Sequence, residues 1–386
     1  MSLTRLFKLS LALVSAFVIA PQISNAQYTV VHRFGDGSQS LDGAYPGNTL
    51  TVTPNGIFGA TTDEFSTELP GFIHHPTVFS LLTNGSVLIV YDFLHSLLVP
   101  NCPLLYYKNA FFGTTDRGPA SSPGGVLFRL RESPLQGVWH SVDLHTFASN
   151  GSDNPSFANT PVILGSNGDL YGTTYSGGPA GQGTIYRLNP SSHLLKVLYN
   201  FDGTIGNPSS LMLAKDGNYY GTSGGTVISN GSPIPVGAIF KMTPAGTVTV
   251  LYTLAHAIHD PLIQANDGNF YGTVSDTVIK MTPEYVVSVL FTFPEGNGGH
   301  GIVQGPTGNL YGTTSNGGTA NNGTIYELTT DGASYQVLHN FGDGSVSNDG
   351  LNPASTLVVG SDNNLYGTTP FGGGAADAGT IFEISP

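Results

Sequence analysis

Short runs of alternating apolar and polar residues, separated by glycine- and asparagine-rich turns, fill most of this chain. In one representative unit, 161–164, 170–174, 184–188 and 196–201 are the alternating runs, and Asn167-Gly168 separates the first two. Alternation with a period of two predicts half-buried strands. Asn-Gly favours a two-residue hairpin, because both turn positions need a positive φ. The pattern therefore predicts a four-stranded antiparallel meander.

This unit recurs seven times. The second strand of each copy carries an aromatic residue followed by glycine and, in most copies, two threonines. The aromatic residues are Phe58, Phe112, Tyr171, Tyr220, Tyr271, Tyr311 and Tyr366. Successive copies lie roughly 40 to 59 residues apart, a period typical of a propeller or a solenoid. We interpret this signature as structural, with the aromatic ring between repeats and the glycine allowing close backbone approach.

The two ends of the repeat array distinguish a propeller from a solenoid. The seventh copy ends one strand short, at 381–386, whereas the segment 28–37 nearly duplicates 335–344 in the sixth copy. A solenoid ends in capping repeats, while a closed ring can complete its last unit with its first strand. We therefore predict an all-β fold, a seven-bladed β-propeller of four-stranded antiparallel blades over 27–386, with 28–34 completing the last blade.

The first 26 residues have the pattern of a secretory signal peptide. Arg5 and Lys8 precede an apolar run at 9–20, and small residues lead to a cleavage site near Ala26. We predict a secreted or periplasmic protein, a monomer with no membrane span in the mature chain. The single cysteine, Cys102, excludes a disulfide within the chain.

The charge content of the chain argues against one class of binding partner. Only 10% of the residues are charged and the net charge is −13, with no basic run in the mature sequence. Nucleic acid is therefore not expected as a partner.

The repeat sequence also resembles a known family. The stretches at 171–188, 309–328 and 366–384, of the form Tyr-Gly-Thr-Thr followed by a glycine-rich loop and Gly-Thr-Ile, are similar to the GloVer tandem repeat of exported bacterial proteins. Members of that family are described by the variety of their C-terminal anchors, whereas the residues up to Pro386 lead us to expect none here. The resemblance implies export and a repeat architecture, and it implies no particular activity.

In a propeller of this topology, the long loops, among them 176–182, 223–236 and 315–322, emerge on one face, together with the linkers between blades. We expect function on this long-loop face. Tyr175 and Phe371 follow the repeat signature there and are candidates for stacking on sugar rings, although packing between blades explains the same residues. The fourth strands carry Tyr, Phe or His at one shared position, so His32, His145 and His339 are expected to pack rather than bind metal.

Two clusters of polar residues are further candidates. Asp63, Glu64, Glu68, His74 and His75 form the densest titratable group, which acid–base chemistry could use, although a solvated loop explains the same residues. Oxygen-bearing side chains alternate in two linkers, a pattern that ordinary turns explain and that Ca²⁺ could also use; their carboxylates are Asp36, Asp42, Asp343 and Asp349. No other cofactor is expected.

The sequence favours a non-catalytic binding or surface-interaction module, whose partner is an extracellular glycan or a cell-surface protein. The alternative is an extracellular polysaccharide lyase or hydrolase on a propeller scaffold. A purely structural repeat protein is a third interpretation, because propellers host all three roles.

Overall fold

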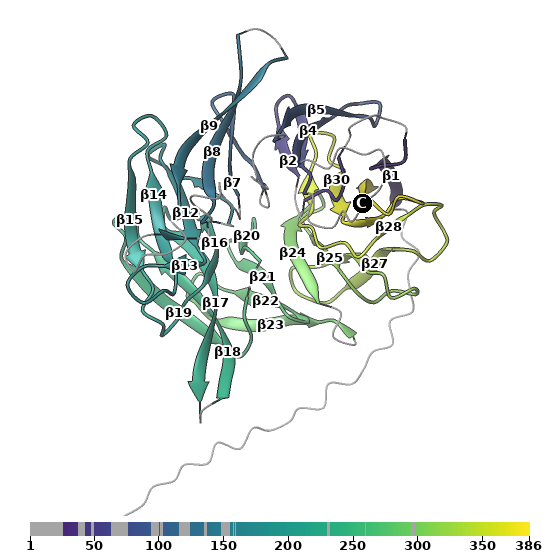
Figure 1. Cartoon of the computed structure of the whole chain (residues 1–386). Coiled ribbons are helices and arrows are strands. Elements are labelled where there is room, and N and C mark those ends of the chain that lie inside the picture. The colour runs from purple at the N-terminus through teal and green to yellow at the C-terminus, as the bar shows by residue number, and fades with distance from the viewer. Residues whose placement is uncertain are drawn as a thin grey trace, which may run out of the picture.

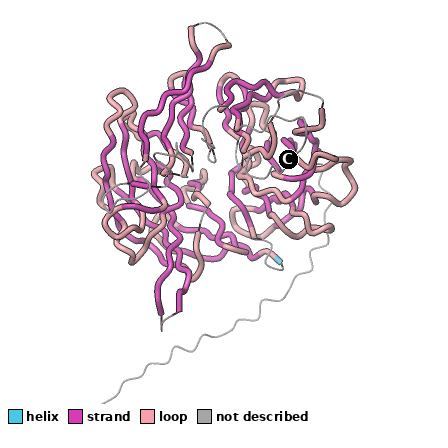
Figure 2. The backbone as a smooth tube through the Cα atoms, in the orientation of Figure 1, coloured by secondary structure: helices cyan, strands magenta, loops and turns pink. Residues whose placement is uncertain are grey.

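Seven four-stranded antiparallel sheets form a closed ring in the computed structural model (Figure 1). The structure describes residues 26–37, 43–47, 50–62, 76–93, 100, 103–115, 124–134, 137–147, 155–156, 158, 160–229, 232–258, 260–294 and 298–386. The predicted signal peptide at 1–26 lies outside these ranges except for Ala26. Within the described residues the chain consists of strands and loops, apart from one short 3-10 turn at Pro294, drawn in cyan in Figure 2, and contains no α-helix. Accordingly, no helix in this part of the chain has the length and apolar character needed to cross a bilayer.

Each blade is numbered in chain order, and its strands are given from the centre of the ring outward. Blades one to three consist of β2 (Thr51–Thr53), β3 (Gly56–Ala60), β4 (Thr77–Leu81), β5 (Val87–Asp92); β6 (Leu105–Tyr107), β7 (Ala110–Thr114), β8 (Val126–Glu132), β9 (Trp139–Thr146); and β11 (Ile163–Leu164), β12 (Leu170–Thr174), β14 (Thr184–Leu188), β15 (Leu195–Asn200). Blades four and five consist of β16 (Pro208–Leu213), β17 (Tyr219–Ser229), β18 (Ser232–Met242), β19 (Val248–Leu254); and β20 (Ile263–Gln264), β21 (Phe270–Val274), β22 (Thr277–Met281), β23 (Val287–Thr292). Blades six and seven consist of β24 (Gly299–Gln304), β25 (Leu310–Thr314), β26 (Thr324–Leu328), β27 (Tyr335–Asn340); and β29 (Val358–Val359), β30 (Leu365–Thr369), β32 (Thr380–Ser385), β1 (Gln27–Arg33).

Strand β1 closes the ring, as predicted. It pairs antiparallel with β32, with Gln27 opposite Ser385 and Arg33 opposite Thr380. The register shifts by a bulge between Val30 and His32, and the outer strands of the other blades carry a bulge at the corresponding place. The N-terminal strand is therefore a regular fourth strand that comes from the other end of the chain.

The repeat signature fills the interior of each blade. All five residues of β12, of β25 and of β30 are buried. A Cβ atom added at Gly312 would lie 2.4 Å from the hydroxyl of Tyr326 on the adjacent strand, so only glycine fits beneath that ring. The second threonine bonds the neighbouring strand, with 2.8 Å between Thr314 Oγ1 and Thr324 Oγ1. The structural interpretation of the signature is thus confirmed in this blade.

The hydrophobic core lies between blades rather than at one centre. Each cluster of buried side chains combines residues of two neighbouring blades, such as Tyr171 of blade three with Tyr219 of blade four, whose rings stack at 4.4 Å. Phe201 and Phe240 pack edge to face in the same cluster. Because every blade buries its apolar side chains against the next one, the ring is stabilised only when it is complete.

One predicted loop is wrong. The segment 223–236 is a continuation of two strands, because β17 and β18 pair from Tyr219 opposite Met242 to Ser229 opposite Ser232. This long hairpin extends beyond the rest of the ring (Figure 1). Two short sheets also form where linkers meet loops; they pair β10 (Pro155–Ser156) with β13 (Ser176–Gly177), and β28 (Gly350–Leu351) with β31 (Phe371–Gly372).

Candidate functional site

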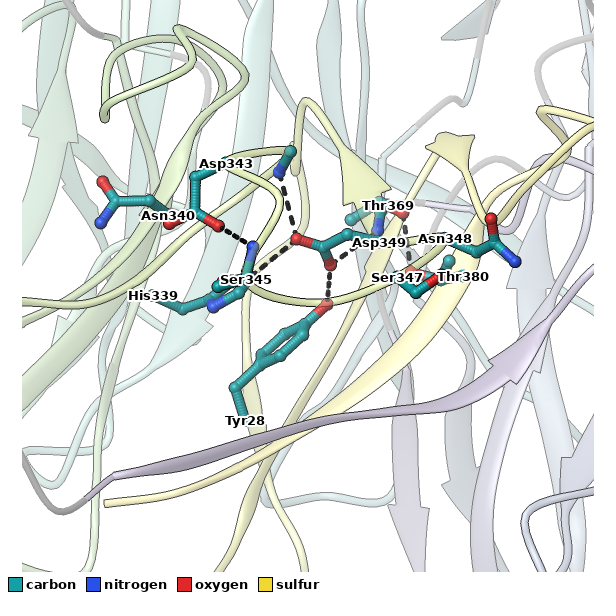
Figure 3. Close-up of polar contacts among 12 residues, drawn as sticks. Tyr28, His339, Asn340, Asp343, Ser345, Ser347, Asn348, Asp349, Thr369 and Thr380 are labelled. Atoms are coloured by element: carbon teal, nitrogen blue, oxygen red, sulfur yellow. Dashed lines mark hydrogen bonds and ion pairs between the residues drawn. The ribbon is translucent and has the colours of Figure 1, made fainter.

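The long-loop face carries a groove at the boundary of blades five and six. The equivalent place at the boundary of blades six and seven is occupied by a linker. There the linker 342–350 lies against β1 and β27 (Figure 3). The ring of Tyr28 stacks on that of His339, with centroids 3.6 Å apart and planes within 5°. The hydroxyl of Tyr28 donates to Oδ1 of Asp349 over 2.6 Å, and His339 Nε2 lies 2.9 Å from Oδ2. A carboxylate of the linker is thereby anchored to both outer strands.

Asp349 has a complete set of hydrogen-bond partners. Its Oδ1 also accepts from the backbone N–H of Gly350, at 2.8 Å, and its Oδ2 from that of Gly342, at 3.1 Å. Burial acts to raise the pKa of Asp349, but the hydrogen bonds from His339 and Tyr28 outweigh it, so the pKa lies below its ordinary value. Burial, together with the carboxylate, raises the pKa of the Tyr28 phenol. Asp349, Tyr28 and His339 therefore form a structural contact between the linker and the two outer strands, in which the carboxylate is fully hydrogen-bonded.

Arg33 holds the rest of this linker. Its Nε donates to the carbonyl of Asn348 and its Nη2 to that of Ser347, each over 3.1 Å. From Phe341 to Pro353 the linker is long enough to fold into the space between the blades. From Phe293 to Gly299, at the preceding boundary, it is about half as long.

The equivalent groove between blades five and six is open. Tyr335 takes the place of Tyr28, and it stacks on Phe291 with centroids 4.3 Å apart and planes within 14°. No linker carboxylate reaches Tyr335 in the described part of the chain. The result is a groove of about 550 Å³, within the range of small-ligand sites.

Aromatic rings and amides line this groove. Phe293 and Tyr335 contribute their rings, edge to face at 6.1 Å. The amide oxygen of Asn340 accepts the N–H of Thr319, and that of Asn321 accepts the N–H of Gly317. These bonds fix the two amide groups, whose nitrogens make no hydrogen bond to any described residue.

A tight turn at Gly318 forms one rim of the groove, beside Asn340. Its φ is +74°, and an added Cβ would lie 2.8 Å from Asn340 Oδ1. Glycine therefore lets the loop lie directly over the Asn340 amide.

The groove has the chemistry of a neutral binding site. Among the described residues, its lining consists of Phe293, Pro294, Thr314, Gly317, Gly318, Thr319, Asn321, Thr324, Tyr335, Val337 and Asn340, none of which is Asp, Glu, His, Lys or Arg. Burial raises the pKa of Tyr335 to about 12, so its phenol stays protonated at neutral pH. Such a site can donate and accept hydrogen bonds and stack on a ring, but its described residues hold no acid–base pair.

The aromatic residues predicted to bind sugar lie elsewhere on the same face. Tyr175 is 47% exposed beside the loop of blade three, whereas Phe371 is half-buried in β31 of blade seven and packs edge to face on Tyr45. Because blades one and two separate them on one side of the ring, the two residues do not form one site. Their role in binding stays a prediction.

The other predicted site residues are only partly described. Asp63, Glu64, Glu68, His74, His75 and Asp42 lie outside the described residues. Asp36 and Asp343 are exposed, and Asp343 accepts the N–H of Ser345. Asp349 would have to exchange its four hydrogen bonds for calcium. No group of three His, Cys, Asp or Glu side chains suited to a metal occurs among the described residues, and the calcium site stays a prediction.

The groove residues were missed in the sequence, although two signals mark them. The linker after Phe293 is the shorter one, and Tyr335 replaces Leu195, which begins the outer strand in blade three. The packing role of the fourth-strand histidines is confirmed for His339, which also binds Asp349.

Solved structures share the architecture. A streptogramin B lyase matches with a TM-score of 0.61 and 15% identity, over 93% of this chain and 97% of that one. A virginiamycin B lyase from Staphylococcus aureus matches with a TM-score of 0.59 and 14% identity, over 94% and 99%. The extracellular domain of a one-component system from B. thetaiotaomicron matches with a TM-score of 0.60 and 11% identity, over 93% of this chain and 40% of that one. At these identities the likeness shows the propeller fold alone.

Sequence comparison gives the family. A search of curated proteins finds no match. The model of the Gloeobacter/Verrucomicrobia repeat matches residues 71–276 and 258–386, which together cover most of the chain and include six of the seven repeat signatures. The resemblance to the GloVer repeat is thereby confirmed, and the chain belongs to the Gloeobacter/Verrucomicrobia repeat family.

Proposed function

We propose that this protein is an exported, non-catalytic binding module that holds a neutral sugar unit of an extracellular glycan in the groove between blades five and six. The observation that carries the proposal is that the described residues lining the groove are all uncharged, whereas at the next boundary a linker carboxylate occupies the equivalent place. Export rests on the signal-peptide pattern of residues 1–26.

The chemistry of the groove supports a sugar ligand. The apolar face of a pyranose ring packs well on aromatic side chains such as Tyr335. Its hydroxyl groups need donors and acceptors, and the amide nitrogens of Asn340 and Asn321, which bond no described residue, are donors in fixed positions. The hydroxyl of Thr319 stands beside them on the same rim.

Two substitutions test the site, each in a protein whose melting temperature is measured alongside. Tyr335→Leu installs the residue that blade three has at this position, and Asn340→Ala removes one amide donor. We expect each to weaken glycan binding about tenfold, because a lost stacking contact or buried hydrogen bond costs about 1–2 kcal/mol. The measurement is calorimetric titration with neutral oligosaccharides selected by depletion from a polysaccharide panel.

The matched control is Asn200→Ala. Asn200 lies against Gly178 in blade three as Asn340 lies against Gly318 in blade six, but it does not line the groove. Asn200→Ala should leave the affinity unchanged. Equal losses in the two alanine variants, or binding that survives Tyr335→Leu and Asn340→Ala, would contradict the groove as the site.

If the protein is instead an enzyme, incubation with the polysaccharide panel should give a different result. A lyase or hydrolase would release new sugar ends, whereas a binding module depletes the protein from solution without releasing any. In the described structure, Asp260, which precedes β20, accepts a hydrogen bond from Thr273 Oγ1, and Nε2 of His300 in β24 lies 3.1 Å from Ser315 Oγ. New ends would make Asp260, His300 and the 63–75 cluster the first positions to substitute.

A further inference from the structure

A second recess, on the tight-turn face, is lined by positive charge in an otherwise acidic protein. It lies between blades two and three, has a volume of about 350 Å³, and contains Lys108, Arg129 and Arg131. The chain has only 12 lysines and arginines against 25 acidic residues. We call this recess the basic cleft.

The partners of the equivalent cations in other blades show what Arg129 lacks. The residue opposite the signature aromatic on the third strand is Arg187, Lys241 or Lys280 in blades three to five. Arg187 Nε lies 3.3 Å from Asp169 Oδ2, and Lys241 Nζ lies 3.2 Å from Asp216 Oδ2. Lys280 Nζ donates to the carbonyl of Thr330. Each of these cations has an acceptor within the protein.

Blade two has the cation without the acceptor. Arg129 lies opposite Phe112, which has no hydroxyl, and the first turn of this blade is Lys108-Asn109, which carries no carboxylate. The Nε of Arg129 is buried without a hydrogen bond, and the side chain makes no ion pair with the described residues. A buried donor that stays unpaired costs stability, and a bound acceptor would remove that cost.

The opposite wall of the cleft is polar and nearly neutral. Its one carboxylate, Asp169, is bonded by Arg187, by Asn167 Nδ2 at 2.9 Å and by Asn189 Nδ2 at 2.7 Å. Tyr107 and Ser191 add hydroxyl groups to the lining. Among its described residues the cleft thus combines three cations with hydroxyls, and the single anion there, Asp169, is already paired.

We propose that the basic cleft binds an acidic saccharide unit, whose carboxylate or sulfate is held by Arg129 and Arg131. A guanidinium fork matches a planar or tetrahedral oxyanion by paired N–H donors, and Arg129 Nε would thereby gain its missing acceptor. Lys108 adds a third positive charge, and its Nζ lies 4.9 Å from the ring centre of Tyr107. The hydroxyls of Tyr107 and Ser191 would meet the hydroxyls of the sugar.

The experiment titrates the purified protein with four probes. They are trigalacturonate, a sulfated disaccharide, inorganic phosphate and the neutral galactotriose. We expect one acidic saccharide to bind more tightly than phosphate and galactotriose, and to weaken as salt rises because exposed charge pairs are screened. Trigalacturonate binding would identify a carboxylate ligand, and disaccharide binding a sulfate ligand.

Two variants and a control assign the site. Arg129→Gln and Arg131→Gln should each weaken binding about tenfold or more, since a hydrogen bond to a charged group is worth about 1.5–3 kcal/mol. Lys196→Gln removes an exposed cation on β15, outside the cleft, and should have no effect. The melting temperature should hold in Arg129→Gln, because its Nε has no partner to lose.

Three results would overturn the proposal. They are no binding of either acidic saccharide, phosphate binding as tightly as both, and affinity unchanged in both arginine variants. The neutral groove is tested separately, because Tyr335→Leu should leave the binding of acidic probes unchanged. Failure of the acidic saccharides to bind would therefore leave the proposal for the neutral groove intact, and the reverse also holds.

Discussion

At the scale of single residues, the structure depends on a few polar groups whose environment differs from blade to blade. Asp349 is 7% exposed and receives four hydrogen bonds, two of them from the outer strands of blades six and seven. The sequence marked Asp349 as a calcium candidate because its spacing suits oxygen ligands. Spacing alone could not reveal Tyr28, which lies 321 residues away and occupies one of its oxygens.

We expect Asp349→Asn to lower the free energy of unfolding by about 2–4 kcal/mol at neutral pH, because it disrupts a buried, hydrogen-bonded charge. The folded-state pKa of Asp349 is depressed, so its contribution is present above the ordinary value near 4 and is lost as pH falls through the folded value. The difference between the wild type and the variant, measured by urea denaturation from pH 7 to pH 2, should therefore shrink below about pH 4. A difference that stays constant with pH would exclude the charge as its cause.

At the scale of elements, the repeated alternation was enough to predict the blades, and the near-duplicate segments were enough to predict closure by β1. The hairpin of β17 and β18 was missed because Pro233 and Pro235 indicate a loop. The pairing of β18 with β19 begins only at Gly237, and both prolines precede it in the free part of the hairpin. Their lack of an N–H therefore costs no hydrogen bond to β19. The groove was missed for another reason, since it depends on how far a linker reaches in space.

The pairing of β1 with β32 predicts the behaviour of a rearranged chain. Gln27 lies opposite Ser385, so a short turn could join the end of β32 to the start of β1, as in the other blades. A circular permutant that begins at Gly43 and carries 27–37 after Pro386 should melt at or above the parent temperature, whereas deletion of 28–34 should give an unfolded or aggregated protein. The measurement is thermal denaturation followed by circular dichroism. A deletion variant that melts cooperatively near the parent temperature would contradict closure by β1.

At the scale of the whole molecule, the seven inter-blade clusters make each blade depend on two neighbours. Trp139 is the only tryptophan and packs beside Phe111 in blade two, with ring centroids 5.8 Å apart. Its fluorescence reports one blade, while circular dichroism near 218 nm reports all seven.

Because the ring is closed, we expect the two signals to change together in guanidinium chloride, with one midpoint and one slope. Phe201→Ala, in the cluster between blades three and four, should move both midpoints equally and cost about 3–5 kcal/mol. An earlier transition in circular dichroism that leaves Trp139 unchanged would mean that blades unfold separately, as in a solenoid.

The closing strand also sets an order of events in biosynthesis. β1 is among the first segments to be synthesised, yet its partner β32 appears about 350 residues later. At about 5–20 residues per second, the delay is roughly 20–70 s. During that interval the strand has no edge to pair with, and its apolar side chains are available to chaperones. The last blade can therefore form only after β32 has been synthesised.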